Sequence, residues 1–275
     1  MAGTKRSVRR AIAALLLLII SALVGGKAYK LAVAYGGVQA LTRRLPDLQK
    51  ISAGTRPRQT EFPVVWLHRV DSVERAVLMA RDYKGMEIDV VYDSASDYFD
   101  VGHPPVPSQG ISLDRIFSSL PGVRGHYFWI DFKNLTDQNK EAACARLLSI
   151  GLKYGIVNQM IVESPNPRAL TCFTMNGFYT SYYLFPETKL SDMNRGQLTD
   201  YYEEVKANLM ASQVNALSSD YRNLPFIEKY FPNGDILLWY LEADKHLRYY
   251  AILAYLRLRP RVKVILVHQR SPGYR

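Results

Sequence analysis

Two acidic residues, Glu87 and Asp89, lie two positions apart in the run Gly-Met-Glu-Ile-Asp-Val-Val. Because their neighbours are apolar or β-branched, the run predicts a buried strand, on which residues i and i+2 share a face. Buried carboxylates on one face cost free energy unless a cation or hydrogen-bond donors compensate them. Hard oxygen ligands of this kind suit Mg²⁺ or Ca²⁺ better than zinc. The pair therefore predicts a site for a divalent cation.

Three further polar residues interrupt apolar runs of the same kind. His68 lies in Val-Val-Trp-Leu-His-Arg-Val, His103 in Val-Gly-His-Pro-Pro, and Asp131 in Tyr-Phe-Trp-Ile-Asp-Phe-Lys. Taken alone, Glu87 and Asp89 are explained equally well by a partly exposed strand end with solvated charges. Five such residues in successive strand-like segments are hard to explain together as packing, so they predict one functional site.

The net charge of +10 is concentrated at the amino-terminal end of the chain. Residues 1–62 hold eleven of the 35 Lys and Arg residues but only two of the 25 acidic residues. The rest of the chain is therefore nearly neutral, which argues against the basic face of a nucleic-acid-binding protein. A hydrophobic fraction of 48% is enough for a sizeable core.

The amino-terminal segment has the pattern of an export signal or a signal anchor. Four cations lie within residues 5–10, and an uncharged apolar run follows at 11–26. A helix of this length spans about 24 Å, short of the ~30 Å hydrocarbon core of a bilayer. Snorkelling of Lys27 and Lys30 would let the following residues complete the span. We favour an uncleaved anchor over a signal peptide cleaved after Gly26.

The expected organisation has four parts. They are a basic cytoplasmic flank at 1–10, a transmembrane signal-anchor helix at 11–32, a linker at 33–62 and the main domain at 63–275. Basic flanks stay in the cytoplasm. The chain is therefore expected to be a single-pass protein of the cell inner membrane with a periplasmic main domain. Secretion after signal cleavage is the alternative.

Short apolar runs alternate with amphipathic ones beyond residue 63, which predicts a parallel α/β domain. Strands are expected over 64–70, 85–92, 127–133, 159–163, 179–185, 214–219, 236–241 and 262–268. Helices are expected over 72–83, 112–120, 138–154, 167–176, 198–212, 223–231 and 244–259. Eight strands favour a closed TIM-type (β/α)8 barrel over an open sheet. The sequence leaves no room for an eighth helix, so either residues 33–48 cover that gap or the barrel is incomplete.

Active sites of TIM barrels form at the carboxyl ends of the strands. The five polar residues above lie late in their expected strands or in the loop after the second strand, and Lys133 ends the third. We expect these six side chains to converge on one mouth. Second-rank candidates at other strand ends are Glu163, Asp220, Trp239 and His268. Trp239 is the aromatic residue that we assign to the substrate pocket.

These motifs resemble those of the glycerophosphodiester phosphodiesterase and phosphoinositide-phospholipase-C-like barrel superfamily. Its members carry His-Arg at the end of strand 1, Glu-x-Asp on strand 2, a second His in the next loop and an acidic-x-Lys pair on strand 3. The matching residues here are His68-Arg69, Glu87-x-Asp89, His103 and Asp131-x-Lys133. The motifs look most similar to those of the menorin branch; they read H-R-V-x-S, E-x-D-V, H-P-P and D-F-K. The similarity covers about residues 63–135, and the later strands only by fold pattern.

Three positions depart from the pattern of the glycerophosphodiesterases. Val70 replaces the glycine that usually follows His-Arg, Pro104 replaces the acid after the second His, and Asp131 stands where many members have Glu. The Asp-x-Lys pair is instead similar to the sphingomyelinase-D-like phospholipases, which release cyclic phosphates. A phosphodiester on a lipid, glycerol or glycan headgroup is therefore the expected substrate class, with the headgroup left open.

The resemblance implies a metal-dependent phosphoric diester hydrolase. Glu87, Asp89 and Asp131 would hold one divalent cation, Mg²⁺ or Ca²⁺, which neutralises a phosphate oxygen. Lys133, two residues beyond Asp131 on the same face, would pair a second phosphate oxygen.

The same resemblance implies acid–base catalysis by histidine. His68 and His103 would act as general base and general acid on opposite sides of the phosphorus, since imidazole titrates near neutral pH. A neighbouring substrate hydroxyl could be the nucleophile, giving a cyclic phosphate that water opens later. Arg69 either binds phosphate or forms a salt bridge behind the strand.

Two rival functions explain less of the sequence. A non-catalytic barrel that binds a surface glycan or a protein partner has no need of two histidines and three acids. A glycoside hydrolase would use paired carboxylates but leaves His68, His103 and Lys133 without a role.

Overall fold

The computed structural model describes residues 45–51, 55, 61–184, 187–242 and 246–269. The expected basic flank at 1–10 and the expected anchor at 11–32 lie outside these residues. Within the described part of the chain, no helix has the length and apolarity needed to span a membrane. The anchor therefore stays a prediction from the sequence.

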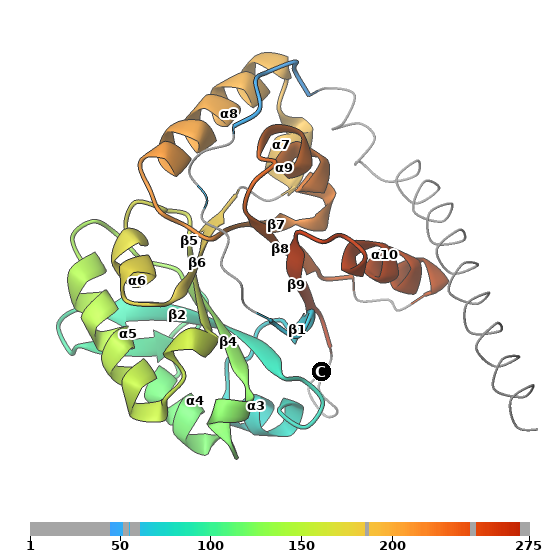
Figure 1. Cartoon of the computed structure of the whole chain (residues 1–275). Helices are drawn as coiled ribbons and strands as arrows, with labels where there is room; N and C mark the ends of the chain where they lie inside the picture. The colour runs from blue at the N-terminus through green and yellow to red at the C-terminus, as the bar shows by residue number, and fades with distance from the viewer. Residues whose placement is uncertain (1–44, 52–54, 56–60, 185–186, 243–245, 270–275) are drawn as a thin grey trace, which may run out of the picture.

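Eight parallel strands close into a barrel (Figure 1). Their order around the barrel is β1, β9, β8, β7, β6, β5, β4 and β2, and the pairing of Leu67 in β1 with Met86 in β2 closes the ring. The barrel expected from the sequence is confirmed. The strands are β1 (Val65–Leu67), β2 (Gly85–Asp93), β4 (Tyr127–Phe132), β5 (Met160–Ser164), β6 (Tyr179–Tyr183), β7 (Ala216–Asp220), β8 (Asp235–Tyr240) and β9 (Val262–Val267).

One further strand, β3 (Tyr98–Val101), pairs antiparallel with the end of β2. The expectation of a plain loop after the second strand is therefore wrong over this stretch. The hairpin turns at Asp97, whose φ of 50° is left-handed, and its carboxylate accepts a hydrogen bond from Tyr92 Oη at 2.6 Å. Phe99 and Val101 bury their side chains, and this burial holds the hairpin against the barrel.

Helices surround the barrel in the βα order expected from the sequence (Figure 1). Side-chain caps begin several of them: Ser72 accepts from the backbone of Arg75, and Asn194 forms a capping box with Gln197. The short helix α7, which precedes α8, was not expected from the sequence. The α-helices are α3 (Val73–Met79), α4 (Leu113–Ser119), α5 (Lys140–Tyr154), α6 (Thr171–Met175), α7 (Glu187–Asp192), α8 (Arg195–Met210), α9 (Leu224–Tyr230) and α10 (Leu247–Arg257).

The described part of the chain has no helix after β9. Residues 45–51 do not fill that position, because they run along α8 and α9 (Figure 1, blue). Tyr230 donates to the carbonyl of Pro46 at 2.5 Å, and Tyr202 donates to that of Gln49 at 2.6 Å. The suggestion that residues 33–48 cover the gap is thus wrong for their described part, 45–48.

Aromatic and aliphatic side chains close the interior of the barrel beneath the site. The ring of Phe62 packs edge-on against Trp66 and Tyr179, with centroids 5.6 and 5.0 Å away. The first residue of β2 is Gly85, and only glycine fits there, because a Cβ would lie 2.2 Å from the indole of Trp66. Side chains i and i+2 share a strand face, so Glu87 lies on the same face as Gly85, one step above this floor. The floor comprises Trp66, Trp129, Ile161, Tyr179, Ala216, Leu237, Val264 and Leu266.

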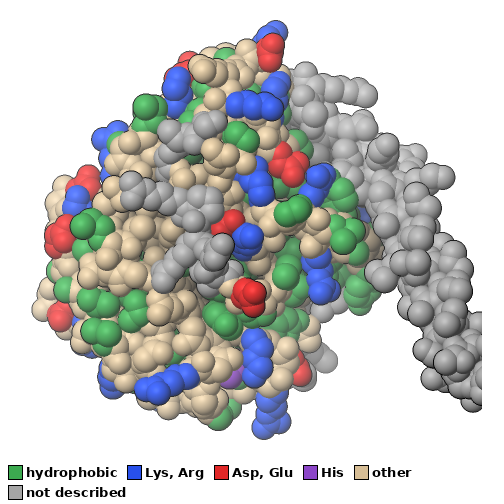
Figure 2. All heavy atoms as spheres, viewed as in Figure 1, with side chains coloured by type: hydrophobic (Ala, Val, Ile, Leu, Met, Phe, Trp, Pro, Cys, Tyr) green, Lys and Arg blue, Asp and Glu red, His purple; other side chains and the backbone are tan. Residues whose placement is uncertain are grey.

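Charged side chains on the outside are mixed in sign. Figure 2 shows Lys and Arg side chains of the described residues spread over one face, with Asp and Glu side chains among them. This distribution matches the near-balance of charge that the sequence has beyond residue 62.

Candidate active site

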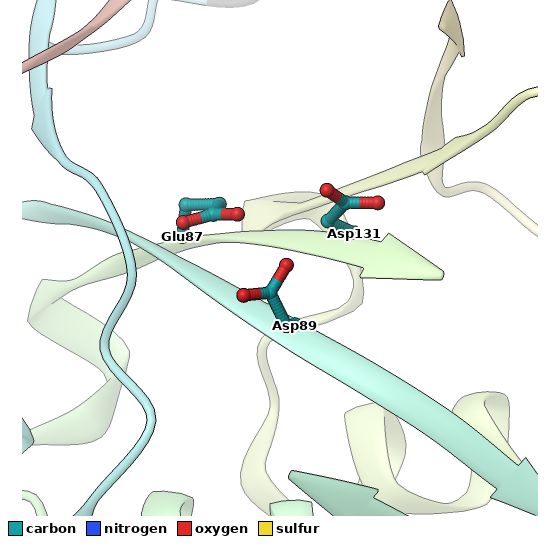
Figure 3. Close-up of side chains that lie close together, drawn as sticks. All are labelled: Glu87, Asp89 and Asp131. Atoms are coloured by element: carbon teal, nitrogen blue, oxygen red, sulfur yellow. The ribbon is translucent and has the colours of Figure 1, made fainter. Parts of the chain in front are cut away.

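Three carboxylates meet at the carboxyl end of the barrel (Figure 3). Glu87 and Asp89 come from β2, and the strand register places Asp131 of β4 beside Asp89. Oxygen atoms of the three groups lie within 4.8 Å of one another. Glu87 and Asp89 are only 2% and 1% exposed. The E-x-D pair therefore points inward, as its spacing predicts.

Burial and mutual repulsion disturb the ionisation of this cluster. Burial raises the pKa of Glu87 well above its usual range, and the neighbouring Asp89 and Asp131 carboxylates raise it further. Burial also raises the pKa of Asp131. Asp89 Oδ2 is buried and has no hydrogen-bond partner among the described residues. Such a group of acids is stable as three anions only beside a cation.

Lys133 is the cation that the structure places against these acids. Its ammonium lies 2.7 Å from Asp89 Oδ1 and also donates to Asp131 Oδ2. Burial by itself lowers the pKa of Lys133, but Asp131 and Asp89 outweigh burial and hold this pKa above its usual range. The lysine is therefore charged at neutral pH.

The turn after β1 places His68 and Arg69 at the same mouth. Arg69 has a left-handed φ of 61°, and its backbone N–H donates to the Glu87 carboxylate. Arg75 of α3 holds the turn from behind, because its guanidinium donates to the carbonyls of Arg69 at 2.9 Å and His68 at 3.3 Å. The guanidinium of Arg69 lies 3.8 Å from both Asp71 and Asp89 and lines the cavity.

His68 is held in its neutral form. Burial lowers its pKa to about 4, and the partial compensation by Asp89 does not restore it. His268 and Arg69 make smaller contributions in the same direction as burial. The Nδ1 atom of His68 is buried without a hydrogen-bond partner among the described residues. A neutral imidazole can accept a proton at neutral pH, which is the requirement for a general base.

His103 follows the β2–β3 hairpin and returns to the acid cluster. The backbone N–H of Gly102 donates to the carbonyl of Asp89 at 3.0 Å. This bond ties the loop to the strand that carries two of the carboxylates. The half-buried His103 therefore lines the cavity with His68.

All eight residues assigned a role from the sequence line one cavity of about 280 Å³. The structure thus brings them together, while their chemical roles stay predictions. Of the second-rank candidates, Glu163 lines the same cavity. Asp220 instead forms an ion pair with Arg222 at 2.9 Å, and His268 is an electrostatic neighbour of His68. The lining residues are His68, Arg69, Glu87, Asp89, His103, Asp131, Lys133, Glu163, Tyr183, Trp239, Leu241 and Leu266.

An apolar and aromatic wall faces the charged residues. Trp239 stacks on Tyr183 with a centroid separation of 5.2 Å and an interplanar angle of 13°. Leu241 and Leu266 continue this wall. Burial, followed by the charge of Glu163, raises the pKa of Tyr183 to about 12, so its hydroxyl remains a hydrogen-bond donor. The sequence indicated Trp239 but gave no reason to separate Tyr183 from the other tyrosines.

Comparison with known proteins identifies the fold. Neither the family models nor the curated proteins contain a match to this sequence. A solved glycerophosphodiester phosphodiesterase from Parabacteroides distasonis is 13% identical and superposes with a TM-score of 0.50, covering 79% of this chain and 94% of its own.

Two provisionally assigned glycerophosphoryl diester phosphodiesterases have similar structures. The protein from Silicibacter pomeroyi is 13% identical with a TM-score of 0.51, covering 78% of this chain and 92% of its own. The protein from Agrobacterium tumefaciens is 11% identical with a TM-score of 0.52, covering 75% and 93%. The chain therefore shares the TIM-barrel fold of these solved phosphodiesterases, which is the fold that the resemblance in its motifs implies.

Proposed function

We propose that this protein is a metal-dependent phosphoric diester hydrolase that acts on a lipid, glycerol or glycan phosphodiester. The observation that carries the proposal is the content of one cavity, in which two histidines, three carboxylates and a lysine face one another. A binding barrel would not need this combination, because each type of group has a separate task in phosphoryl transfer.

The carboxylate cluster fits a hard divalent cation. Three oxygen donors lie close enough to share one ion, and the buried Asp89 Oδ2 makes no hydrogen bond in the described structure. Glu87, Asp89 and Asp131 would hold Mg²⁺ or Ca²⁺, which prefer such ligands. When bound, the ion would supply positive charge to a phosphate oxygen.

The histidines divide the proton transfers between them. The neutral His68 would take the proton from the attacking hydroxyl as the new P–O bond forms. His103 would give a proton to the leaving oxygen as the old P–O bond breaks. The attacking hydroxyl belongs either to the substrate, which gives a cyclic phosphate, or to water. Lys133 and Arg69 would pair the remaining phosphate oxygens.

A panel of phosphodiesters, each followed by phosphorus NMR, tests the proposal directly. The panel comprises a glycerophosphodiester, a diacyl phospholipid, a sphingomyelin and a sugar phosphodiester. We expect turnover of one class with Mg²⁺ or Ca²⁺ and none with EDTA. The phosphorus signal of the product separates a cyclic phosphate from a hydrolysed monoester. Protein that binds the metal but turns over no diester would instead support the non-catalytic barrel.

We also propose that residues 11–32 anchor the barrel at the outer side of the cytoplasmic membrane. Four cations at 5–10 precede the apolar run, and such cations remain on the cytoplasmic side. A carboxyl-terminal fusion to alkaline phosphatase should then be active, and a fusion to a reporter that needs the cytoplasm should be silent. The reverse pattern would contradict this orientation. Release of a soluble form would favour cleavage of the segment.

A further inference from the structure

The ammonium of Lys133 lies where the acid cluster needs positive charge. It contacts Asp89 Oδ1 at 2.7 Å and donates to Asp131 Oδ2, and both carboxylates belong to the group of three whose oxygens lie within 4.8 Å. The lysine side chain is 21% exposed. The protein without ligands therefore carries its own cation at this cluster.

A divalent cation and this ammonium compete for the same two carboxylates. A metal bound by the three acids takes oxygen atoms of Asp89 and Asp131, the two carboxylates whose Oδ1 and Oδ2 atoms, respectively, Lys133 engages. The two positive charges would also repel each other at such short range, and the partly buried surroundings screen that repulsion poorly. Entry of a metal is therefore opposed unless Lys133 gains another anionic partner.

We propose that Lys133 makes the binding of the metal and of the phosphodiester mutually dependent. In the free protein Lys133 neutralises Asp89 and Asp131, and in the loaded protein it transfers to an oxygen of the bound phosphodiester while the metal takes its place. This inference rests on the metal site and the substrate class proposed above. It adds that neither ligand binds well alone.

Thermodynamic linkage requires the effect of each ligand on the affinity for the other to be equal. If the phosphodiester raises the metal affinity by some factor, the metal raises the phosphodiester affinity by the same factor. Couplings between ligands usually amount to about 5–150-fold. Because the ion also meets a phosphate oxygen directly, removal of the Lys133 charge should reduce this coupling, and the part that it removes is the part that Lys133 carries.

Isothermal titration calorimetry with two probes tests the inference. Mg²⁺ and Ca²⁺ are titrated into the full chain, alone and with dimethyl phosphate, a diester that lacks a neighbouring hydroxyl. In the wild type we expect dimethyl phosphate to tighten metal binding by about 5-fold or more. In Lys133→Met, the metal alone should bind at least about 5-fold more tightly than in the wild type, and dimethyl phosphate should tighten metal binding by a clearly smaller factor than in the wild type.

A matched control and a second measurement separate this effect from misfolding. Lys153 contacts Asp114 at 2.7 Å, but its side chain is 58% exposed and outside the cavity, so Lys153→Met should leave both constants unchanged. The coupling in the wild type needs no variant. Lys133→Met is expected to melt early, because it leaves Asp89 and Asp131 without their cationic partner. The wild-type coupling still tests the inference in that case.

Three outcomes would overturn the inference in distinguishable ways. Unchanged or weaker metal binding by a folded Lys133→Met would show that the lysine does not compete with the ion. Independent binding of metal and dimethyl phosphate to the wild type would remove the coupling while leaving the metal site of the proposed function intact. Absence of metal binding to both proteins, with and without dimethyl phosphate, would remove the metal site itself.

Discussion

Glu87→Gln should abolish the response of this protein to Mg²⁺ or Ca²⁺ without lowering the stability of its metal-free form. An uncharged amide oxygen is a much weaker ligand than the carboxylate in this cluster of three, so metal affinity should be lost at working concentrations. Turnover should then fall by about 10²–10³-fold, the size expected for removing several kcal/mol of charge stabilisation in the transition state. Alanine at Asp89 or Asp131 should likewise weaken the metal response.

The stability of the metal-free variant follows from burial. Glu87 is 2% exposed, and burial together with Asp89 and Asp131 raises its pKa. The neutral amide avoids this repulsion, and its oxygen can still accept the backbone N–H of Arg69. The melting temperature in EDTA should therefore match or exceed that of the wild type, while the rise on adding metal disappears.

A control variant distinguishes the cluster from acids elsewhere at this end of the barrel. Asp220 ends β7 but pairs with Arg222 at 2.9 Å and lies outside the cavity. Asp220→Asn should keep the metal response. A wild-type protein whose turnover and melting temperature are the same in EDTA and in Mg²⁺ or Ca²⁺ would rule out the metal site.

The sequence was sufficient for the barrel because each strand is a short apolar run between polar turns. Buried parallel strands give this pattern without regard to distant contacts. The site could also be predicted, since the alternation of a strand puts Glu87 and Asp89 on one face. The late position of Asp131 in its strand then carries it to the same end of the barrel.

The missed features depend on contacts between distant residues. The strand β3 is stabilised by the hairpin that it forms with β2, and its four residues give too short a pattern to separate from a loop. Arg75 supports the turn of His68 and Arg69 from a helix face, where an arginine normally indicates only a solvated surface. Tyr183 lines the cavity and stacks on Trp239, whereas Tyr182 faces the helices and accepts a hydrogen bond from Asn208.

His68→Ala and His103→Ala should each lower turnover by on the order of 10²-fold or more, the usual contribution of a positioned general base or acid. Neither change should alter folding or metal binding much. His68 Nδ1 has no hydrogen-bond partner among the described residues, and His103 is half-buried in a loop. Their imidazoles thus add little to the stability of the fold, and neither belongs to the carboxylate cluster.

A structural histidine should behave in the opposite way, and the chain provides one. His126 is 4% exposed, and its ring nitrogens lie 3.3 and 3.1 Å from the carbonyls of Gly122 and Ala80. His126→Ala should therefore lower the melting temperature, because it leaves a buried cavity and removes the buried ring whose Nε2 lies against the carbonyl of Ala80. The folded fraction of this variant should retain normal turnover, which can be measured below its melting temperature.

The double variant of His68 and His103 gives the sharpest test, because a base and an acid that act in one transition state are not independent. Its loss of turnover should be far smaller than the product of the two single losses. If the loss in the double variant equals the product of the two single losses, the histidines act in separate steps. If both single variants melt early like His126→Ala and their folded fractions turn over normally, the histidines are structural. The catalytic assignment would then be wrong even if the metal site is correct.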